Sequence, residues 1–573
     1  MSATTASFGN LCTCVRASIC DKPAATADPG KQEMGAFEPC VWGDFLVTYN
    51  PPLSQSLERS MRERAEQLKD QVRGLFEDGE DRSVADVVTL VETLERLGID
   101  YHFRGEIGTA LRRILNEEPE HGAASLHDLH VAALRFRLLR QHGFWVSADI
   151  FDKFKDETGN FSPSLRNDPV SLLSLYNAAH MATPSEDTLN DVIVFSRYHL
   201  EVLRNKLRSP MAEQVSRALD IPLQRTVGRL ETMNYIREYE QVELNSGPLL
   251  ELSKLDFELV RSLHLKELKA LSLWWRDLYD HVKLSYARDR LVENYFWACS
   301  VFHEEESSRT RLMFVKTFGL LSLMDDTYDV HATLEECYKL NEAIQRWDRS
   351  AASILPEYLH TFYIKLLDNI KEFEDTLGPH EKYSLSYAEE AIKSLSEYYL
   401  HEAKWSNEKY APSFKEHLEV SHMSLGFPTL AIVMLMGVGN TATKKAFDWA
   451  VNVPNIVRAS GQIARFLNDI ASYKMGKTNN KDVASSVECY MKEHLVAGEE
   501  AVAVISALAE DTWRMMNQAC MEIEPALLPA AQLVVNLTKM LEVIYLGGRD
   551  GYTFGGDLKS LITGLFLKPI VVG

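Results

Sequence analysis

Apolar residues recur along most of the chain at the three- and four-residue spacing of an amphipathic helix. The stretches 90–98 and 134–143 both place leucines on one helical face and then reach a glycine, a residue that commonly ends helices. Alternating runs of β-branched residues between tight turns are scarce, so no sheet is expected. The pattern predicts an all-α protein.

Breaks that contain glycine and proline separate the helical stretches, and the most central of them is Asn245-Ser-Gly-Pro248. A chain of 573 residues is too long for one compact domain, and no fixed-period repeat is evident. We therefore expect a flexible N-terminal tail over residues 1–40, an N-terminal helical domain over 41–245 and a C-terminal domain over 246–573.

The charge balance narrows the possible ligands. The chain has 61 basic and 82 acidic residues, a net charge of −21, whereas a protein that grips nucleic acid or an anionic membrane needs the opposite sign. An anionic ligand would therefore require local cations or bound metal ions.

The eight cysteines include no CxxC pair, which is typical of a reduced intracellular protein. No membrane span is expected, because the longest apolar run, 425–438, contains a glycine and a proline.

The sharpest chemical signal is the acidic cluster Asp325, Asp326 and Asp329, which follows the apolar run 318–324. Residues four apart on a helix share a face and lie roughly 6 Å apart, so Asp325 and Asp329 are predicted to point the same way. Burying uncompensated carboxylates is costly, and Mg²⁺ removes that cost by binding a few carboxylates together with substrate oxygens. The cluster therefore favours a metal site for a phosphate-containing ligand.

Three other interpretations of this cluster remain open at this point. Acidic residues at an exposed helix start would favour the positive end of the helix dipole. A Ca²⁺ loop would need a glycine and a closing glutamate that are not at the required spacing. A phosphatase-type aspartate nucleophile would need an alternation of strands and helices, which is missing.

Two further polar clusters strengthen the metal interpretation. Asn468 and Ser472 stand four residues apart in a helical pattern, although Asn and Ser are poor helix formers, so a polar task is indicated. Arg288 and Arg290 are two residues apart and so do not share a helix face, which places them in a loop or first turn. Arginine offers a planar, bidentate fork for phosphate.

These clusters belong to long blocks through which the chain resembles the plant terpene synthases, from Trp42 to the C-terminus. The blocks are RDRLVENYFW at 288–297, DDTYD at 325–329, EAIQRWD at 342–348, RFLNDIASYK at 465–474, SSVECYM at 485–491, LVETLERLGIDYHF at 90–103, LRFRLLRQHGFWVSADIFDKF at 134–154 and DGYT at 550–553. Several such blocks in the correct order are far more specific than a lone DDxxD motif.

The resemblance implies an N-terminal α-barrel-like domain and a C-terminal terpenoid-synthase helical bundle that ionises a prenyl diphosphate. It implies three Mg²⁺ ions, with Mn²⁺ as a substitute, and metal ligands on two rims: Asp325, Asp326 and Asp329 on one, Asn468 and Ser472 on the other. It also implies a set of residues that receive the diphosphate directly or through the metal ions: Arg288, Arg290, Asp325, Asp329, Arg465 and Asn468.

Aromatic side chains are expected where a carbocation has to be stabilised without being attacked. Trp297 is the leading candidate by its place in the family block, with core packing as the alternative. Tyr545 and Tyr552 are similar candidates, and Asp550 opens a segment that resembles the family's lid, although Asp-Gly is also a common surface turn. The segment 424–428 resembles a broken helix whose freed carbonyls face the cation.

The chain departs from the family pattern at its N-terminus. Monoterpene-type members usually have paired arginines nine and ten residues before the equivalent of Trp42, where this chain has Gln32 and Glu33. The first twenty residues contain a single basic residue, Arg16, which is too few for a confident transit peptide. Both features favour the cytoplasmic sesquiterpene branch, with a plastid location as the alternative.

The second departure is Gly476, which stands where the resemblance implies a metal-binding glutamate. On a continuous helix, Asn468, Ser472 and position 476 would form one stripe about 12 Å long. Water would then complete the site, the protein would need unusually high Mg²⁺, and Gly476→Glu would lower the half-saturating Mg²⁺ concentration. If the backbone is helical there, Gly476→Glu should raise stability by about 0.5–1 kcal/mol.

We therefore expect a sesquiterpene synthase that acts on farnesyl diphosphate and forms a cyclic hydrocarbon or alcohol. The alternatives are a monoterpene synthase on geranyl diphosphate and a catalytically impaired helical binding protein. The expected partner is the small-molecule prenyl diphosphate, without nucleic acid, and the expected state is a monomer, with a dimer as the alternative.

Overall fold

The structure is a computed structural model that describes residues 37–50, 53–77, 82–117, 125–157, 159, 161–242, 247–439, 442–476 and 484–571. Its regular structure is helical, and the only β-pairing within these ranges is an isolated bridge between Lys155 and Phe161. The all-α prediction is confirmed. None of the described helices is long and apolar enough to cross a bilayer.

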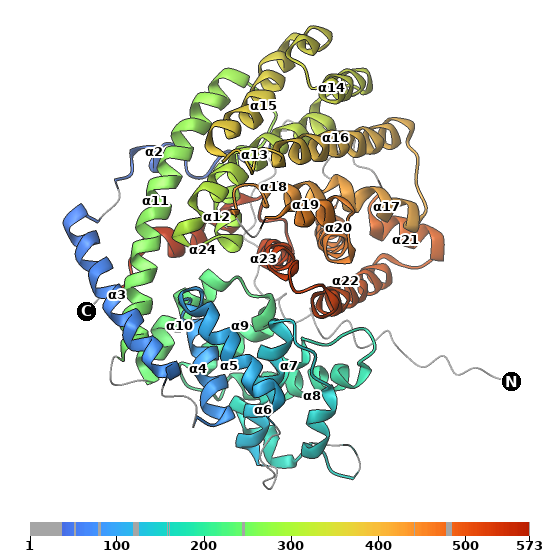
Figure 1. The fold of residues 1–573 in the computed structure, drawn as a ribbon. Helices are drawn as coiled ribbons and strands as arrows, with labels where there is room; N and C mark the ends of the chain where they lie inside the picture. The colour runs from blue at the N-terminus through green and yellow to red at the C-terminus, as the bar shows by residue number, and fades with distance from the viewer. Residues whose placement is uncertain are drawn as a thin grey trace, which may run out of the picture.

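Helices α4 to α10 of the N-terminal half form the lower part of the molecule in Figure 1, and α2 lies higher up, beside α11. The α-helices of this half are α2 (Phe45–Thr48), α3 (Gln55–Glu77), α4 (Val84–Arg96), α5 (Arg104–Asn116), α6 (Leu126–Gln141), α7 (Pro169–Ala179), α8 (Asp187–Arg204), α9 (Met211–Asp220) and α10 (Gly228–Val242). Short 3₁₀ turns at Asp100–Phe103, Ala148–Phe154, Pro163–Asn167 and Leu223–Arg225 connect them.

The leucine patterns read from the sequence correspond to α4 and α6. A capping box starts each helix, through Ser83 with Asp86 and Ser125 with Asp128. The periodic leucines of both helices are buried, and Gly98 and Gly143 adopt φ of +68° and +80° directly after the helices, which glycine does without steric cost. The predicted faces and stops are confirmed.

The C-terminal half begins with the long helix α11 (Pro248–Val282). The following helices are α12 (Leu291–Val301), α13 (Ser308–Asp326), α14 (Leu334–Arg346), α15 (Glu357–Thr376), α16 (Ser384–Glu408), α17 (Phe414–Ser424), α18 (Phe427–Val433), α19 (Lys444–Val451), α20 (Asn455–Met475), α21 (Ser486–His494), α22 (Gly498–Glu522), α23 (Leu528–Ile544) and α24 (Lys559–Ile562). Single turns at Glu305–Ser307, Arg349–Ile354 and Gly555–Asp557 are 3₁₀, whereas Thr327–His331 and Thr563–Leu567 are π-helical.

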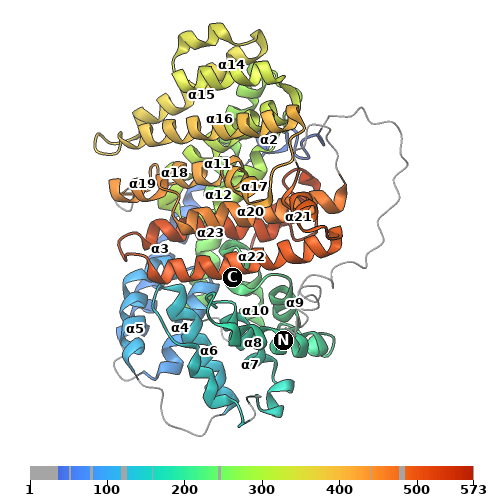
Figure 2. The ribbon, with the colours of Figure 1, turned by 90° about the vertical axis from the view of Figure 1, so that its right-hand side faces the viewer.

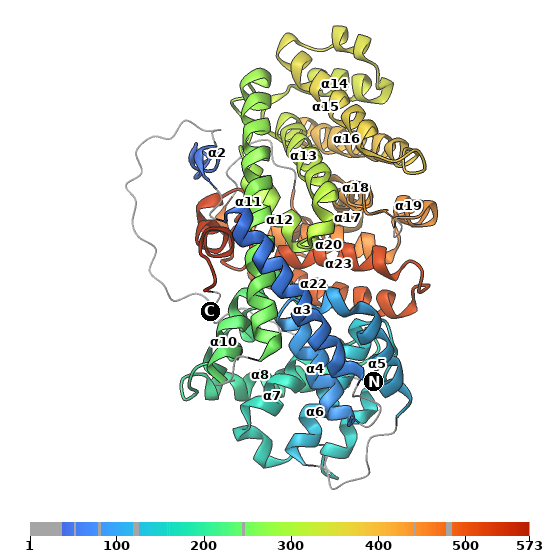
Figure 3. The same cartoon turned by 60° about the vertical axis from the view of Figure 1, so that its left-hand side comes forward.

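The two halves are packed against each other. Helix α3 runs alongside α11, as Figure 3 shows, so an N-terminal helix covers the first helix of the C-terminal half. In Figure 2, α22 lies along the top of the N-terminal helices. There the buried Arg225 guanidinium makes two hydrogen bonds, of 2.7 and 2.9 Å, to the Glu510 carboxylate of α22. The predicted boundary at 245–248 falls partly outside the described residues and stays a prediction, as does the tail over 1–40, most of which also lies outside them.

Candidate active site

A cavity of about 810 Å³ opens within the C-terminal half. Its walls come from α12, α13, α16, α20 and α23, from the break between α17 and α18, and from the turn at 550–554. One side of the cavity carries acidic, amide and guanidinium groups, and the remainder is lined mainly by aromatic and aliphatic side chains. The clusters at 325–329 and 465–472, more than a hundred positions apart in the chain, meet here as predicted.

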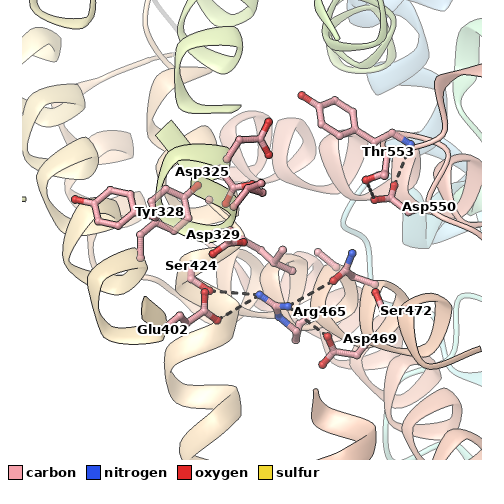
Figure 4. A pocket seen from close by; sticks show the side chains of 18 of the residues that line it. Asp325, Tyr328, Asp329, Glu402, Ser424, Arg465, Asp469, Ser472, Asp550 and Thr553 are labelled. Carbon is pink, nitrogen blue, oxygen red and sulfur yellow. Dashed lines mark hydrogen bonds and ion pairs between the residues drawn. The ribbon is translucent and has the colours of Figure 1, made fainter. Parts of the chain in front are cut away.

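The aspartate cluster lies at the C-terminal end of α13. Asp325 and Asp326 are the last residues of the helix, and Asp329 follows in the π-helical turn Thr327–His331 (Figure 4). The α-helical spacing predicted for Asp325 and Asp329 is therefore wrong in detail, because the helix widens between them. The interpretation as helix-start acids is excluded as well, since a C-terminal end carries partial negative charge and disfavours carboxylates.

The charge of this cluster is not fully neutralised by the protein. Burial is the main cause that raises the pKa of Asp325 to about 6, and the Arg288 guanidinium opposes the shift while Asp326 adds to it. The pKa of Asp329 is raised well above its ordinary value by burial and by the neighbouring Asp325 and Glu402. Both carboxyl groups face the cavity, where a bound cation would offset the electrostatic repulsion between their negative charges.

Asp326 has a different environment from its neighbours. Its side chain is only 1% exposed, and its Oδ2 accepts hydrogen bonds from the backbone N–H of Arg288 at 2.7 Å and from the Arg288 Nε at 3.2 Å. Its Oδ1 lies 2.8 Å from Nη2 of the same arginine. Asp326 therefore holds the arginine loop against α13, and its predicted role as a metal ligand stays a prediction.

Arg288 and Arg290, both predicted to bind diphosphate, have different surroundings in the structure. Arg288 faces the cavity, where it also contacts Asp325 and the Thr553 hydroxyl. Arg290 is outside the cavity lining and fully buried, and its guanidinium donates to four backbone carbonyls, those of Glu38, Asp289, Tyr552 and Thr553 at 2.7–3.0 Å. These contacts make Arg290 an anchor for neighbouring segments, and its predicted role as a diphosphate ligand stays a prediction.

The second rim comes from α20. The Arg465 guanidinium lies 3.5 Å from the Glu402 carboxylate, and donates to the Ser424 hydroxyl at 3.4 Å and to the Asn468 Oδ1 at 3.5 Å (Figure 4). Asn468 donates from Nδ2 to the Tyr545 hydroxyl at 3.1 Å, which brings the predicted Tyr545 to this rim. Ser472 lies one turn further along α20 with an exposed side chain on the cavity wall. Arg465, Asn468 and Ser472 are thus brought together as predicted.

Gly476 does not continue this stripe. Helix α20 ends at Met475, and Gly476 adopts φ +76° and ψ 152°, a combination that is essentially restricted to glycine. The condition for a stabilising Gly476→Glu substitution, a helical backbone, is therefore not met, so the gain in stability that depended on it does not apply.

We expect Gly476→Glu to lower the free energy of unfolding by about 1–3 kcal/mol, because any side chain is strained at this φ and ψ. Gly476→Ala is the matched control, since no atom lies within 4 Å of a Cβ at this position and the two variants share the backbone cost alone. Denaturant unfolding of the three proteins measures the effect. Gly476 lines the cavity, so a lower half-saturating Mg²⁺ concentration for Gly476→Glu than for Gly476→Ala stays a prediction, which a Mg²⁺ titration of the activity of both variants tests. Unfolding of Gly476→Glu at the same denaturant concentration as the original protein would contradict the expected loss of stability.

An aromatic wall faces the two polar rims. The Trp297 ring packs edge-on against Phe318, Phe427 and Tyr552 with centroid separations of 5.5, 5.9 and 6.1 Å, and its Nε1 donates to the Leu537 carbonyl. The Phe318 and Tyr552 rings are parallel, with centroids 5.9 Å apart. Trp297 is 5% exposed yet lines the cavity, so it is both packed and available to a ligand.

The predicted lid turn is held by Asp550. Its Oδ1 accepts the backbone N–H of Tyr552 at 2.9 Å and its Oδ2 accepts the Thr553 hydroxyl at 2.7 Å, the pattern of an Asx turn. Asp550 and Tyr552 both line the cavity, and Tyr552 is 8% exposed, which excludes a plain surface turn. The broken helix is confirmed too, since α17 ends at Ser424 and α18 starts at Phe427 after Gly426 at φ +78°.

Several residues of the cavity were not singled out in the sequence. Glu402 and Tyr399 on α16 face the two rims, and Phe37 places its ring 4.9 Å from the Arg288 guanidinium carbon. A single acid on a long amphipathic helix resembles a solvated surface residue, so the sequence around Glu402 gives no signal. Only the fold brings it opposite Asp329.

The donor set of the two rims suits Mg²⁺. The groups that face the cavity are hard oxygens of carboxylates, an amide and a hydroxyl, from Asp325, Asp329, Glu402, Asn468 and Ser472. Among the described residues, no three carboxylate, imidazole or thiol groups converge to form a closed site.

Comparison with known proteins assigns the family. Residues 276–515 match the metal binding domain of the terpene synthase family, and residues 41–219 match the terpene synthase N-terminal domain. The chain is 59% identical over 539 residues to eudesmanediol synthase from Zea mays, covering 93% of this chain and 96% of that protein. It is 46% identical over 553 residues to tau-cadinol synthase from Zea mays, covering 95% and 100%. The chain belongs to the terpene synthase family.

A solved relative of this terpene synthase contains the implied metal ions. The structure of isoprene synthase from grey poplar, Populus x canescens, in complex with three Mg²⁺ ions and dimethylallyl-S-thiolodiphosphate superimposes with a TM-score of 0.81 at 30% identity, covering 92% of this chain and 98% of that chain. The fold class and the metal-binding domain predicted for this terpene synthase are thereby confirmed.

Proposed function

We propose that this terpene synthase ionises farnesyl diphosphate, releases diphosphate and cyclises the cation to a sesquiterpene hydrocarbon or alcohol. The observation that carries the proposal is the division of one cavity into two polar rims and an aromatic wall. The polar rims suit a diphosphate and its metal ions, and the wall suits a long hydrocarbon chain. The names of the relatives, eudesmanediol synthase and tau-cadinol synthase, support a sesquiterpene product.

We further propose that Asp325, Asp329, Glu402, Asn468 and Ser472 hold three Mg²⁺ ions, which Mn²⁺ replaces. Bound metal ions stabilise the negative charge that develops on the departing diphosphate oxygens. Glu402 joins the ligands predicted from the sequence because its carboxylate faces Asp325 and Asp329, as their raised pKa values reflect.

The side chains around the rims orient the leaving group. Arg288 and Arg465 supply guanidinium forks from opposite sides of the cavity, and the Thr553 hydroxyl lies 3.2 Å from Arg288. Trp297, Phe318 and Phe427 present ring faces and edges that stabilise a cation without adding to it, about 2 kcal/mol or more each when desolvated. The apolar side chains of the wall leave little for bulk water to bind beside the cation.

The substrate preference tests the proposal. We expect farnesyl diphosphate to be consumed with a higher kcat/KM than geranyl diphosphate, because residues 32 and 33 lack the arginine pair of the monoterpene branch. These residues lie outside the described part of the structure. Purified protein is incubated with Mg²⁺ and each substrate, and the released diphosphate and the volatile products are quantified.

Equal or faster turnover of geranyl diphosphate would favour the monoterpene alternative, and no turnover of either substrate would favour the impaired binding protein.

The same preparation gives the oligomeric state, for which we propose a monomer. A cytoplasmic location is proposed from the same N-terminal features and is tested by imaging a C-terminally tagged chain in plant cells.

A further inference from the structure

A pair of hydroxyl groups interrupts the aromatic wall. The Tyr552 hydroxyl donates to the Ser322 Oγ at 3.0 Å, and both side chains are buried and line the cavity. Ser322 lies three residues before Asp325 on α13, and four residues after Phe318, the ring that is parallel to Tyr552. The pair therefore lies where the aromatic wall meets the aspartate end of α13, with the Arg288 guanidinium carbon 5.3 Å from the Tyr552 ring centre.

Three other residues of the cavity lining, Tyr328, Tyr545 and Ser424, already have hydrogen-bond partners for their hydroxyl groups. The Tyr328 hydroxyl pairs with Ser396, which is fully buried outside the cavity lining. Tyr545 accepts from Asn468, and Ser424 donates to the Ser421 carbonyl and accepts from Arg465. These groups belong to the polar rim or to the core behind it.

The position of Tyr552 is fixed from two directions. Its backbone carbonyl accepts from the Arg290 Nε at 2.8 Å and its N–H donates to Asp550, while its ring packs on Phe318 and Trp297. Burial raises the pKa of the Tyr552 phenol, although Arg288 opposes the shift, so the hydroxyl keeps its proton at neutral pH. Its hydrogen remains available for the bond to Ser322.

The remaining hydrogen-bonding capacity of the pair matches one water molecule. Tyr552 gives its hydrogen to Ser322, so Ser322 keeps a hydrogen to donate and Tyr552 keeps a lone pair to accept. A buried water needs at least two polar partners. A water that accepts from Ser322 and donates to Tyr552 has both, and it retains one lone pair that points away from the pair.

We propose that Ser322 and Tyr552 hold a single water molecule on the aromatic wall, and that this water adds to the cyclic cation to form an alcohol. The inference rests on the proposed function. The water lone pair forms the carbon–oxygen bond at the cationic carbon, and the resulting oxonium loses a proton to the released diphosphate, the strongest base enclosed with it. No electron transfer takes place, and water is the only co-reactant.

A single held water would allow a cavity that excludes bulk water to form an alcohol. Bulk water would quench every allylic cation at once, so the wall has to be dry. One water fixed by Ser322 and Tyr552 reaches only the cation whose charge comes to lie beside Phe318 and Tyr552. The hydroxyl pair would in this way set which intermediate is hydroxylated.

The test is Ser322→Ala with farnesyl diphosphate and Mg²⁺ in H₂¹⁸O. In the unsubstituted protein we expect an alcohol that carries ¹⁸O. In the variant we expect the alcohol share of the products to fall at least about fivefold and the hydrocarbons to rise, with total diphosphate release within about threefold. Ser322→Thr keeps the hydroxyl and should restore the alcohol share.

Ser396→Ala is the matched control, because it removes a buried serine hydroxyl from a similar Tyr–Ser pair, and this serine, unlike Ser322, lies outside the cavity lining. Its product ratio should not change. If Ser322→Ala does not fold, Tyr552→Phe removes the other hydroxyl while keeping the ring, and the same loss of alcohol is expected.

Four results would overturn the inference. An unchanged product ratio at a lower rate would make the pair a structural contact between α13 and the turn at 550–554, and an equal loss of alcohol in Ser396→Ala would show that the effect is not local. Products without ¹⁸O would refute the held water while leaving the sesquiterpene synthase intact. If farnesyl diphosphate is not consumed at all, the proposed function fails and the inference fails with it.

Discussion

Asp325→Ala is expected to lower turnover of farnesyl diphosphate by at least about 10²–10³-fold, the loss that follows removal of one group that stabilises developing negative charge. Asp325 faces the cavity at the end of α13 with its pKa raised to about 6. A raised carboxyl pKa means that the charged form opposes folding at neutral pH. The variant should therefore unfold at the same denaturant concentration as the original protein, or a higher one.

Two measurements separate a metal ligand from a structural residue here. Diphosphate release gives the activity, and Mg²⁺ titration in the presence of diphosphate, followed by calorimetry, gives the loss of metal binding. Asp326→Ala is the contrasting variant, because Asp326 binds the Arg288 backbone and should lose stability as well as activity. Near-normal turnover by Asp325→Ala would remove it from the metal site.

Asp469→Asn is expected to lower the free energy of unfolding by about 3–5 kcal/mol, the usual cost of leaving a buried ionic partner unpaired. The Asp469 carboxylate is 3% exposed and accepts the Ser486 backbone N–H at 2.6 Å. It lies 3.2 Å from His417 Nε2 and 3.3 Å from Arg465 Nη1. In the variant, the asparagine NH₂ group, which is itself a donor, would face the hydrogen-bond donors that now bind the carboxylate.

The pH dependence of stability provides a second measurement. Burial acts to raise the pKa of Asp469, but Arg465, His417 and the Ser486 N–H outweigh it and lower the pKa to about 2. The folded pKa lies below the unfolded value of about 3.9, so the stabilisation is complete above about pH 4 and is lost as the pH falls towards 2. Asp469→Asn should lack this acid-sensitive step.

Asp329→Asn is the control for both measurements. It makes the same chemical change on the opposite rim, where the carboxyl pKa is raised and the charge opposes folding. No loss of stability is expected from it. If the two asparagine variants unfold alike, the Asp469 network does not stabilise the fold as described.

Helical periodicity was sufficient to predict the fold class, because it reports which faces are buried. The stops of α4 and α6 were predicted for the same reason, since glycine at positive φ is a local property of the chain. The π turn after Asp326 was not predictable, because the same residues are compatible with a continuing α-helix. In the folded protein the Tyr328 hydroxyl pairs with Ser396 and the Thr327 hydroxyl with Tyr286, and both partners come from segments distant in the sequence.

Some residues of the site could likewise be predicted from the sequence, and others could not. Clusters that are continuous in sequence, such as 325–329 and 465–472, were predictable from residue type and spacing. The orientation of Arg290 was not, because it depends on carbonyls from segments more than two hundred positions away. Glu402 was missed since its role depends on which side chains α16 faces, and the sequence of one helix does not contain that information.

The Arg290 guanidinium connects the two ends of the described chain. It donates to the Glu38 carbonyl before α2 and to the Tyr552 and Thr553 carbonyls after α23, while Lys559 donates to the Val41 carbonyl at 3.3 Å. The segment at 37–41 and the turn at 550–554 both border the cavity mouth through Phe37 and Thr553. Neither segment can swing outwards without breaking bonds to the same side chain. The two segments are thereby mechanically coupled, because a displacement of either one strains the hydrogen bonds of the other through the Arg290 guanidinium.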